Sequence, residues 1–399
     1  MVAPYLASIY GGPSKVVKEL TQGLAAKGIN VDLVTTNANG DRKLTVPLNQ
    51  WIEEGSYRTK YFNCLHQYDS ILSASLGRWL SQHAKDYDIV HTHTMFAPTM
   101  AIAHWICKRQ EIPYITTPHG MLEPWALSYK ASKKRLYYRN FEVPALKTAS
   151  AIHVLNQQEA RNVHILGFNQ TKIIPNGIHR AEFEHLPDPE HFYQKFPITR
   201  GKKIILFLGR IDPKKGLDLL APAFAKVCRQ FPNAHLVLAG PDSIDFLPTA
   251  KGYFEQAGYS EAITFTGMLS GTLKQAALSA ADVYVSPSYS EGFSMSILEG
   301  MAAKLPCVIT EKCNFPEAET ARAARVVEVN TEAIASALQQ TLQNPEQSLA
   351  MGERARELVF QEYTWDCAAD RLISLYRQIS RPLAALASVR DEKPTAAKA

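Results

Sequence analysis

Short apolar runs alternate with amphipathic segments along almost the whole chain, and this alternation limits the fold more than any other feature. The runs are apolar on both sides, which is typical of parallel strands that helices cover on both faces. The segments between them have helical periodicity, as in Val16–Lys27 and Leu217–Arg229. The pattern therefore predicts an α/β fold. The predicted strands form two series, Ile29–Thr36, Asp88–His91, Tyr114–Thr117 and Ala151–Leu155, then Ile204–Gly209, His235–Gly240, Ile263–Gly267, Val283–Ser286, Cys307–Thr310 and Val326–Val329.

The two series predict two doubly wound, Rossmann-like domains, because 399 residues exceed one ordinary core. The segment Pro175–Lys203 is rich in Pro, His and charge, interrupts the alternation, and is interpreted as the linker. The first strand has only Met1–Ser8 available, so it is either short or trimmed at this start. The predicted parts are an N-terminal domain at 1–180, a C-terminal domain at 200–362, a closing helix at 363–380 (Trp365–Ile379) and a disordered tail at 381–399.

Composition excludes several classes of protein. The net charge of +5 is too small for a nucleic-acid-binding protein, which needs a clustered basic face. No apolar run approaches the roughly 20 residues of a membrane span, and the start does not resemble a signal peptide. The six cysteines form no CxxC pair, which fits a reducing cytoplasm. A cytoplasmic enzyme without nucleic-acid partners is predicted.

The most informative motif, Ser290–Gly300, carries two glutamates eight positions apart, Glu291 and Glu299. It follows a predicted strand and opens a predicted helix whose N-cap is Ser294. A helix N-terminus offers unpaired N–H groups and partial positive charge, which bind phosphate or sugar oxygens. The two carboxylates are spaced to hold hydroxyl groups at two points of one elongated ligand. A capped helix with two solvated glutamates is the alternative interpretation.

A second motif, Gly209–Gly216, follows the first strand of the second series and contains Arg210 and Lys215. Ligands bind outside the carboxyl ends of strands in open α/β sheets. Arg210 can fork two oxygens and Lys215 adds a point charge, so the pair can neutralise a diphosphate without a metal. A charged surface loop is the alternative, which is weakened because both motifs follow strands of one sheet.

A glycine pair, Gly11-Gly12, stands before Pro13 at a predicted helix start. Glycines let the backbone approach a ligand closely, although an ordinary turn explains this pair equally well. The pair does not form the GxGxxG fingerprint of nicotinamide dehydrogenases, which argues against that class.

Histidines follow several predicted strands of the N-terminal series. His91, His93 and His119 are predicted to lie near the carboxyl edge of the sheet. His119, in a Pro-His-Gly turn, is singled out as the candidate site residue. His153 falls inside a strand and is interpreted as structural.

One further segment, Lys130–Arg139, interleaves basic residues with aromatic residues on a predicted helix. This composition suits an anionic membrane surface or an anionic lipid-linked acceptor. A solvated basic helix face is the alternative interpretation.

Taken together, these residues resemble glycosyltransferase family 4, whose members have the GT-B fold of two Rossmann-like domains facing across a deep cleft. The resemblance covers nearly the whole chain, and the paired glutamates are its most specific part. The elements that occur in the family's order are Gly11-Gly12, His119-Gly120, Ile174–Ile178, Gly209–Gly216 and Glu291–Glu299.

The resemblance implies a role for each motif. Glu299 would hold the ribose of a nucleotide-sugar donor, Glu291 the donor sugar, and His119 would lie beside the reacting sugar. The implied catalytic residues are His119, Glu291, Arg210 and Lys215. The implied donor-binding residues are Gly12, Arg210 and Lys215 at the diphosphate, Met268 and Leu269 at the base, and Glu291, Gly292, Phe293, Ser294 and Glu299 at the sugars and helix start.

The resemblance also implies a reaction. A retaining transferase would move a hexose from a nucleotide-diphosphate sugar, with UDP-glucose as the first choice, to a hydroxyl of a glycan or lipid-linked oligosaccharide in exopolysaccharide or envelope glycan synthesis. The N-terminal domain would bind the acceptor, no metal or other cofactor would be required, and Lys130–Arg139 would touch the inner face of the membrane. The alternatives are an inverting transferase, a glycogen or starch synthase, a sugar-nucleotide epimerase, and a catalytically silent nucleotide-sugar-binding subunit.

Overall fold

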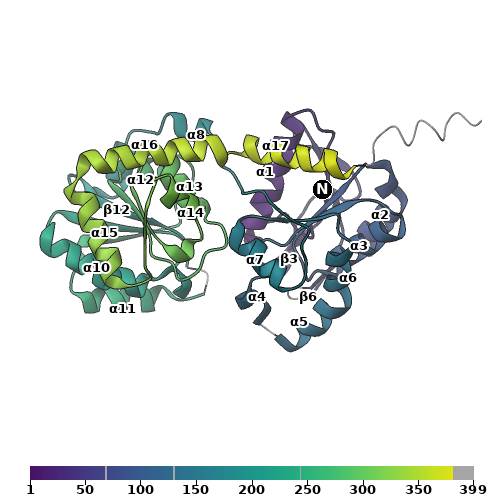
Figure 1. The fold of residues 1–399 in the computed structure, drawn as a ribbon, viewed down its shortest axis with the longest axis horizontal. Coiled ribbons are helices and arrows are strands. Elements are labelled where there is room, and N and C mark those ends of the chain that lie inside the picture. The colour runs from purple at the N-terminus through teal and green to yellow at the C-terminus, as the bar shows by residue number, and fades with distance from the viewer. Residues whose placement is uncertain (68–69, 129–130, 243, 381–399) are drawn as a thin grey trace, which may run out of the picture. The chain divides into compact units, whose positions relative to one another are not determined.

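A computed structural model describes residues 1–67, 70–128, 131–242 and 244–380. The chain divides into two compact units: Met1–Ile174 with the residues from Ala368 onward, and Pro175–Cys367. Figure 1 shows that each unit is a sheet with helices packed against it. The tail predicted at 381–399 lies outside the described residues.

The C-terminal unit contains a parallel six-stranded sheet in the order β14-β13-β12-β15-β16-β17. This is the third, second, first, fourth, fifth and sixth strand along the chain, the order of doubly wound nucleotide-binding sheets. The order reverses between β12 and β15, so the loops after these strands flank the switch point where such sheets bind ligands. The strands are β12 (Lys203–Leu208), β13 (Ala234–Ala239), β14 (Ile263–Gly267), β15 (Val283–Ser286), β16 (Cys307–Thr310) and β17 (Arg325–Val327).

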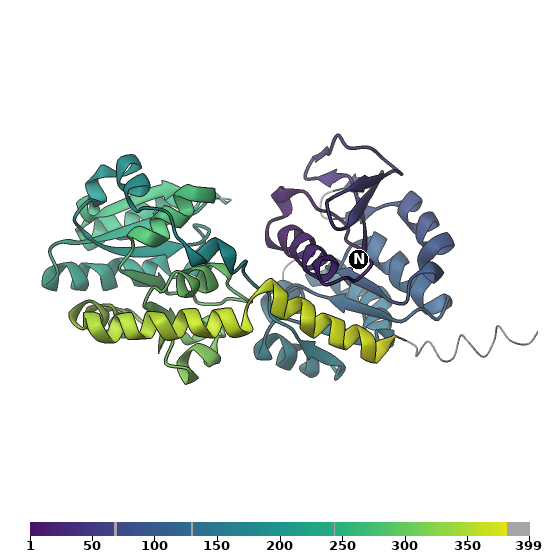
Figure 2. The same cartoon turned by 90° about the horizontal axis from the view of Figure 1, so that it is seen from above.

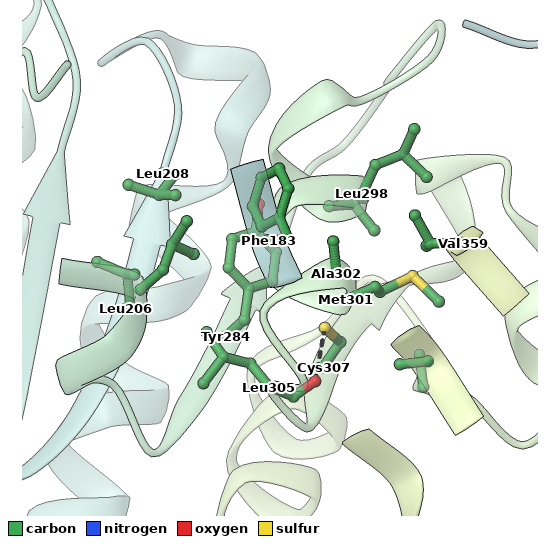
Figure 3. Close-up of a cluster of buried hydrophobic side chains, with 14 of the residues drawn as sticks. Phe183, Leu206, Leu208, Tyr284, Leu298, Met301, Ala302, Leu305, Cys307 and Val359 are labelled. Carbon is green, nitrogen blue, oxygen red and sulfur yellow. Dashed lines mark hydrogen bonds between the residues drawn. The ribbon is translucent and has the colours of Figure 1, made fainter. Parts of the chain in front are cut away.

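Successive residues of these strands face two different cores. Leu206 and Leu208 of β12 pack into one core with helices α8, α9, α12, α13 and α16, whereas Ile205 and Phe207 pack into the other with α10, α11 and α15. Figure 3 shows part of the first core, in which Tyr284 lies among strand and helix side chains. The helices are α8 (Ala181–Glu184), α9 (Glu190–Lys195), α10 (Leu217–Gln230), α11 (Leu247–Ala257), α12 (Gly271–Ala280), α13 (Met295–Ala302), α14 (Pro316–Thr320), α15 (Thr331–Gln343) and α16 (Pro345–Glu362).

The segment predicted as a linker, Pro175–Lys203, belongs instead to the C-terminal unit. It carries the short helices α8 and α9, whose Phe183 and Phe192 are buried in the first core. The linker interpretation was wrong because it followed the polar and proline-rich composition of the segment. Two phenylalanines within that segment are buried, and each removes a large apolar side chain from water.

The N-terminal unit has parallel strands in two groups, β1-β5 and β8-β9-β10-β11, which the chain start connects. Val2 forms parallel bridges to Val34 of β1 and Thr92 of β8, so the first strand is reduced to the residues around Val2. Antiparallel β4 extends the sheet beside β5. The strands are β1 (Asp32–Thr36), β4 (Trp51–Glu53), β5 (Arg58–Phe62), β8 (Val90–His93), β9 (Tyr114–Thr117), β10 (Ala151–Val154) and β11 (Thr171–Ile173), with the small hairpins β2 (Ala38–Asn39)–β3 (Arg42–Lys43) and β6 (Leu65–Gln67)–β7 (Ser70–Leu72).

Helix α17 (Trp365–Ile379) has the bounds that the sequence predicts, and from Ala368 on it belongs to the N-terminal unit. Its Asp370 pairs with Lys27 at the end of α1 at 2.8 Å, and Figure 2 shows the two helices near each other. The other helices of this unit are α1 (Gly12–Ala26), α2 (Ala74–His83), α3 (Pro98–Arg109), α4 (Pro124–Ser128), α5 (Ala131–Tyr137), α6 (Val143–Thr148) and α7 (Gln157–Ile165), and a π-helical turn at Tyr138–Glu142 leads into α6.

Candidate active site

The structure brings together two motifs that lie far apart in the sequence, at the switch point of the C-terminal sheet. Lys215 follows β12 and Glu291 follows the neighbouring strand β15. The Lys215 Nζ lies 2.5 Å from the Glu291 Oε1, and the two side chains are only 14% and 11% exposed. A charge pair so shielded is screened less by solvent than a surface pair. The two motifs therefore form one site.

Close backbone packing holds the loops after β12 and β15 together. The N–H of Tyr289 donates to the carbonyl of Lys214 at 2.8 Å. Gly216 has a left-handed backbone with φ of 68°, and a Cβ there would lie 2.1 Å from the Pro287 carbonyl oxygen. Only glycine permits this approach. The glycine that ends the second motif therefore keeps the loop with Lys215 close to the loop with Glu291.

Glu291 is held at both its side chain and its backbone. The Ser288 hydroxyl donates to the Glu291 Oε1 at 2.6 Å. The Glu291 N–H donates to the Lys312 carbonyl, and its own carbonyl accepts from the Asn314 Nδ2 at 2.6 Å. Ser288 and Asn314 were not predicted from the sequence. The signal for Ser288 was its position three residues before Glu291; the loop after β16 that carries Asn314 offered none.

The second glutamate of the motif is also paired. Glu299 lies on α13, and its Oε1 is 2.7 Å from the Nζ of Lys274 on α12, with side chains 13% and 23% exposed. Lys274 was not predicted from the sequence, although it stands less than two helical turns after the loop that holds Met268 and Leu269. Of those two residues, Met268 is 72% exposed, whereas Leu269 is buried in the first core. Only Met268 therefore presents its side chain to a ligand.

The start of α13 is open to an anion. Ser294 occupies the N-cap position, but its side chain makes no cap hydrogen bond to the helix. The Ser294 hydroxyl instead lies 3.1 Å from that of Ser296, so the predicted cap by this hydroxyl is wrong. A Cβ on Gly292 would meet nothing within 4 Å, and the ring of Phe293 packs against that of Tyr363. The uncapped N–H groups and the helix dipole favour an oxygen anion here.

Arg210 lies on the same loop as Lys215 but is more open. Its side chain is 59% exposed, and its Nη2 lies 3.7 Å from the Asp212 Oδ2. At the start of this loop, Gly209 packs against Gly240 so closely that a Cβ on Gly240 would lie 1.8 Å from the Gly209 carbonyl oxygen. The guanidinium is thus an exposed cation beside a closely packed backbone, and its paired N–H groups suit a phosphate.

The remaining predicted site residues, Gly12 and His119, belong to the N-terminal unit. Gly12 opens α1, and a Cβ there would meet nothing within 4 Å, which leaves room for a ligand. His119 has φ of 52°, an uncommon backbone for a residue with a side chain. Its ring contacts His93, with the His93 Nδ1 3.2 Å from the His119 Nε2. Burial lowers the pKa of His119 to about 3, so the ring is neutral.

A buried carboxylate on α7 supports the turn at His119. The Glu159 Oε1 accepts from the Gly120 N–H at 2.8 Å and its Oε2 accepts from the Leu155 N–H at 2.8 Å. Burial raises the pKa of Glu159 to about 7 despite these two bonds. This contact could not be predicted from the sequence, because Glu159 has the pattern of an ordinary acidic residue in the first turn of a helix.

The basic and aromatic segment at Lys130–Arg139 is only partly a surface feature. Lys130 lies outside the described residues. Tyr137 and Tyr138 turn inward toward Phe96, whereas Leu136 is 63% exposed. Among the side chains of the segment that the structure describes, Arg135 and Arg139 are the exposed cations. The sequence predicted basic residues interleaved with aromatic residues on one helix, and both aromatic residues of the segment are instead partly buried.

Two family models match the chain. The model described as Glycosyltransferase Family 4 matches residues 10–182, and the model described as Glycosyl transferases group 1 matches residues 189–358. Together they span both structural units.

The chain belongs to glycosyltransferase family 4.

Similar proteins support the assignment across the full length of this family 4 glycosyltransferase. A phosphatidyl-myo-inositol mannosyltransferase of Mycobacterium leprae is 25% identical over 403 residues, covering 95% of this chain and 96% of the relative. A D-inositol 3-phosphate glycosyltransferase of Corynebacterium urealyticum is 25% identical over 397 residues, covering 92% and 91%.

Solved structures confirm the predicted GT-B fold for this glycosyltransferase. A sucrose-phosphate synthase from Thermosynechococcus elongatus has a TM-score of 0.74 at 23% identity, covering 96% of this chain and 98% of that one. Anabaena HepE, in a complex with UDP and glucose, has a TM-score of 0.73 at 15% identity, covering 94% and 99%.

Three further findings concern the described part of the glycosyltransferase. No group of three or more His, Cys, Asp or Glu side chains there is arranged to hold a metal ion. No helix there has the length and apolar character needed to cross a membrane. The six cysteines are unpaired, and five of them are buried.

Proposed function

We propose that this glycosyltransferase transfers a hexose from a nucleotide-diphosphate sugar, with retention of configuration, to a hydroxyl of a glycan or lipid-linked acceptor in envelope or exopolysaccharide synthesis. The observation that carries the proposal is the shielded Lys215–Glu291 pair beside an uncapped helix start, with Glu299 farther along that helix. A cation and N–H groups suit a diphosphate, and two flanking carboxylates suit the hydroxyl groups of two sugars.

Charge development explains how these residues would act. Breaking the anomeric bond leaves negative charge on the departing diphosphate, and fixed positive groups aimed at it are usually the largest catalytic contribution. Lys215, Arg210 and the α13 N-terminus supply that charge from the C-terminal unit. In this proposal His119 of the N-terminal unit contacts the donor sugar, and the backbone at Gly12 contacts the diphosphate.

Retention needs either a carboxylate nucleophile or attack from the side on which the diphosphate leaves. In this proposal Glu291 holds sugar hydroxyls and is paired with Lys215, so we favour same-side attack, with a phosphate oxygen taking the acceptor proton. No metal is required, and transfer is expected to persist in a chelator. An α-linked product from an α-linked donor supports retention, and a β-linked product refutes it.

UDP-glucose is the donor we favour, supported by the fold shared with HepE, whose complex contains UDP and glucose. GDP-mannose is the second candidate, since one similar protein is named a mannosyltransferase. Met268 is the residue proposed to contact the base, and Glu299 is the residue proposed to contact the ribose.

A thermal-shift comparison of UDP, GDP and ADP with their hexoses tests the donor. A ligand at 100 times its Kd stabilises the native state by about 2.7 kcal/mol, which raises the melting temperature of a unit of this size by about 5–10 °C. We expect this shift with UDP and UDP-glucose, and no shift with ADP-glucose. A shift with GDP-mannose alone would replace the proposed donor, and a Glu299→Gln variant with an unchanged shift would remove Glu299 from the ribose site.

The acceptor proposal places the enzyme in the cytoplasm, in peripheral contact with the anionic inner face of the cell membrane. Arg135, Leu136 and Arg139 are exposed, and the exposed Trp105 and Phe141 line a shallow pocket between α3 and α6. Basic and apolar side chains together suit a lipid interface. The similar protein named for phosphatidyl-myo-inositol supports an acceptor carried by lipid.

Sedimentation with lipid vesicles tests the contact. Each cation near an anionic surface contributes about 1 kcal/mol, so an Arg135→Gln/Arg139→Gln variant is expected to bind phosphatidylglycerol vesicles about 30-fold more weakly. The matched control, Arg161→Gln/Lys172→Gln, loses the same charge from exposed positions of the same unit and is expected to bind like wild type. Equal loss in both variants would indicate nonspecific attraction and contradict the proposed surface.

A further inference from the structure

Four histidine rings lie together in the N-terminal unit, and three of them, His91, His93 and His153, are buried. His91 and His93 lie on β8, His153 lies on β10, and His119 follows β9. The rings of His91 and His93 stack at 4.4 Å, and those of His93 and His119 at 5.4 Å. Burial is the main reason why the pKa of each histidine is lowered, so all four rings are neutral. Each neutral ring carries one N–H, whose position matters.

The hydrogen-bond partners fix the N–H of two of these rings. The Ile174 carbonyl can only accept, so the His153 Nε2, at 2.7 Å, must carry the proton. The His153 Nδ1 then accepts from the Thr117 hydroxyl at 2.9 Å. That hydroxyl has no second proton, so it accepts from the His91 Nε2 at 2.7 Å. The His91 Nδ1 therefore accepts from the Tyr376 hydroxyl at 2.6 Å.

His91 is consequently held at both ring nitrogens and gives His93 a rigid surface to stack on. The ring of His93 is fully buried, and its Nε2 finds no hydrogen-bond partner among the described residues. Its Nδ1 lies 3.2 Å from the His119 Nε2, so one of these nitrogens donates and the other accepts. Stacking, rather than any bond at Nε2, keeps the His93 ring in place.

Two arrangements of the His93–His119 pair are possible, and the environment of the His93 Nε2 selects one. If His119 donated, the remaining proton of His93 would sit on Nε2, as a buried N–H without an acceptor. If His93 donates from Nδ1, its Nε2 carries only a lone pair. Buried N–H groups without partners are rarer in proteins than acceptors without donors. His93 is therefore the donor, and the His119 Nε2 accepts.

We propose that His93 is a positioning residue that fixes His119 as the tautomer with its proton on Nδ1, so that His119 offers an N–H donor to the sugar donor. The proposal rests on the role of His119 proposed above. In this state His119 donates to a sugar hydroxyl or a phosphate oxygen and is no general base. The φ of 52° and the bond from Gly120 to Glu159 fix the backbone, and His93 fixes the ring.

Long-range nitrogen–proton NMR on protein labelled with 15N in its histidine rings tests the tautomer directly. The His119 signals are assigned by their loss in His119→Gln. In the wild type we expect the proton of His119 on Nδ1, and a proton on Nε2 would overturn the proposal. In His93→Leu we expect His119 to lose this preference, while His104, buried elsewhere with Thr92 as its partner, keeps its signals as an internal reference. An unchanged His119 in His93→Leu would also overturn the proposal.

Activity separates positioning from simple packing. An asparagine at position 93 places an amide nitrogen near the former Nδ1 and can still donate, whereas leucine only fills space. The kcat for UDP release from UDP-glucose is expected to fall about 10- to 100-fold in His93→Leu, with little change in KM, and to recover largely in His93→Asn. Equal loss in both variants, or no loss in His93→Leu, would refute the positioning role. If neither the wild type nor any variant used UDP-glucose, the proposed donor would be wrong. The NMR experiment would still test the tautomer of His119, because it needs no substrate.

Discussion

A Lys215→Met variant is expected to transfer sugar about 100- to 1,000-fold more slowly than the wild type, because this is the usual effect of removing one preorganised group that stabilises transition-state charge. Lys215 is only 14% exposed and lies at the switch point of the sheet, where water screens its charge poorly. Methionine keeps most of the side-chain volume, so the effect reports charge rather than packing. Steady-state kinetics with the donor selected by thermal shift measures it.

The same variant also removes the partner of Glu291. A carboxylate that is 11% exposed and has lost its cation destabilises the fold, so part of any activity loss could reflect unfolding. The double variant Lys215→Met/Glu291→Gln controls for this, because it removes both charges and keeps the hydroxyl contact from Ser288. We expect the double variant to melt close to the wild type and to remain inactive. Substantial transfer by the double variant would show that neither charge serves the reaction.

Local patterns predicted the buried parallel strands well, because a strand covered on both faces is a continuous apolar run. The strands β14, β15 and β16 have the predicted bounds. The small antiparallel strands between β1 and α2 escaped prediction, since strands such as β3 (Arg42–Lys43) are short and exposed and carry no apolar period. The strand around Val2 is defined by its two neighbours and not by its own sequence.

The part of the candidate site that depends only on the order of the strands could be predicted from the sequence. Lys215 and Glu291 could be assigned to one site because their motifs follow strands that are neighbours in a doubly wound sheet. The Lys274–Glu299 pair joins two helices, and its formation depends on how those helices rotate and pack. Periodicity within one helix contains no such information.

The histidine cluster shows the same limit in another form. His91, His93 and His119 were predicted at the sheet edge from strand ends. Their ring contacts depend on alternation along β8, which turns His91 and His93 to the same face, and on the cover that Tyr376 of α17 provides. A sequence pattern assigns a residue to a face, but the proton on a ring nitrogen follows only from the partners it meets.

A second large effect is expected at Gly240, where replacement by alanine should destabilise the C-terminal unit by about 3 kcal/mol. An added Cβ would lie 1.8 Å from the Gly209 carbonyl oxygen and 2.6 Å from its carbon. Both contacts are to backbone, and Gly209 is itself bonded to the Ala239 carbonyl at 2.9 Å, so no side chain can move aside. The ends of β12 and β13 must separate, which displaces the loop that carries Arg210.

Calorimetry of the Gly240→Ala variant should therefore show the transition of the C-terminal unit lowered by about 6–12 °C, with weaker nucleotide binding. Gly252→Ala is the matched control, since it adds the same methyl group inside α11, where a Cβ would meet nothing within 4 Å. Alanine is the better helix former by about 1 kcal/mol, so this variant should melt slightly higher than the wild type. If Gly240→Ala also melted at or above the wild-type temperature, the close approach of β12 and β13 would be wrong. The claim that this packing holds the loop with Arg210 would then be wrong as well.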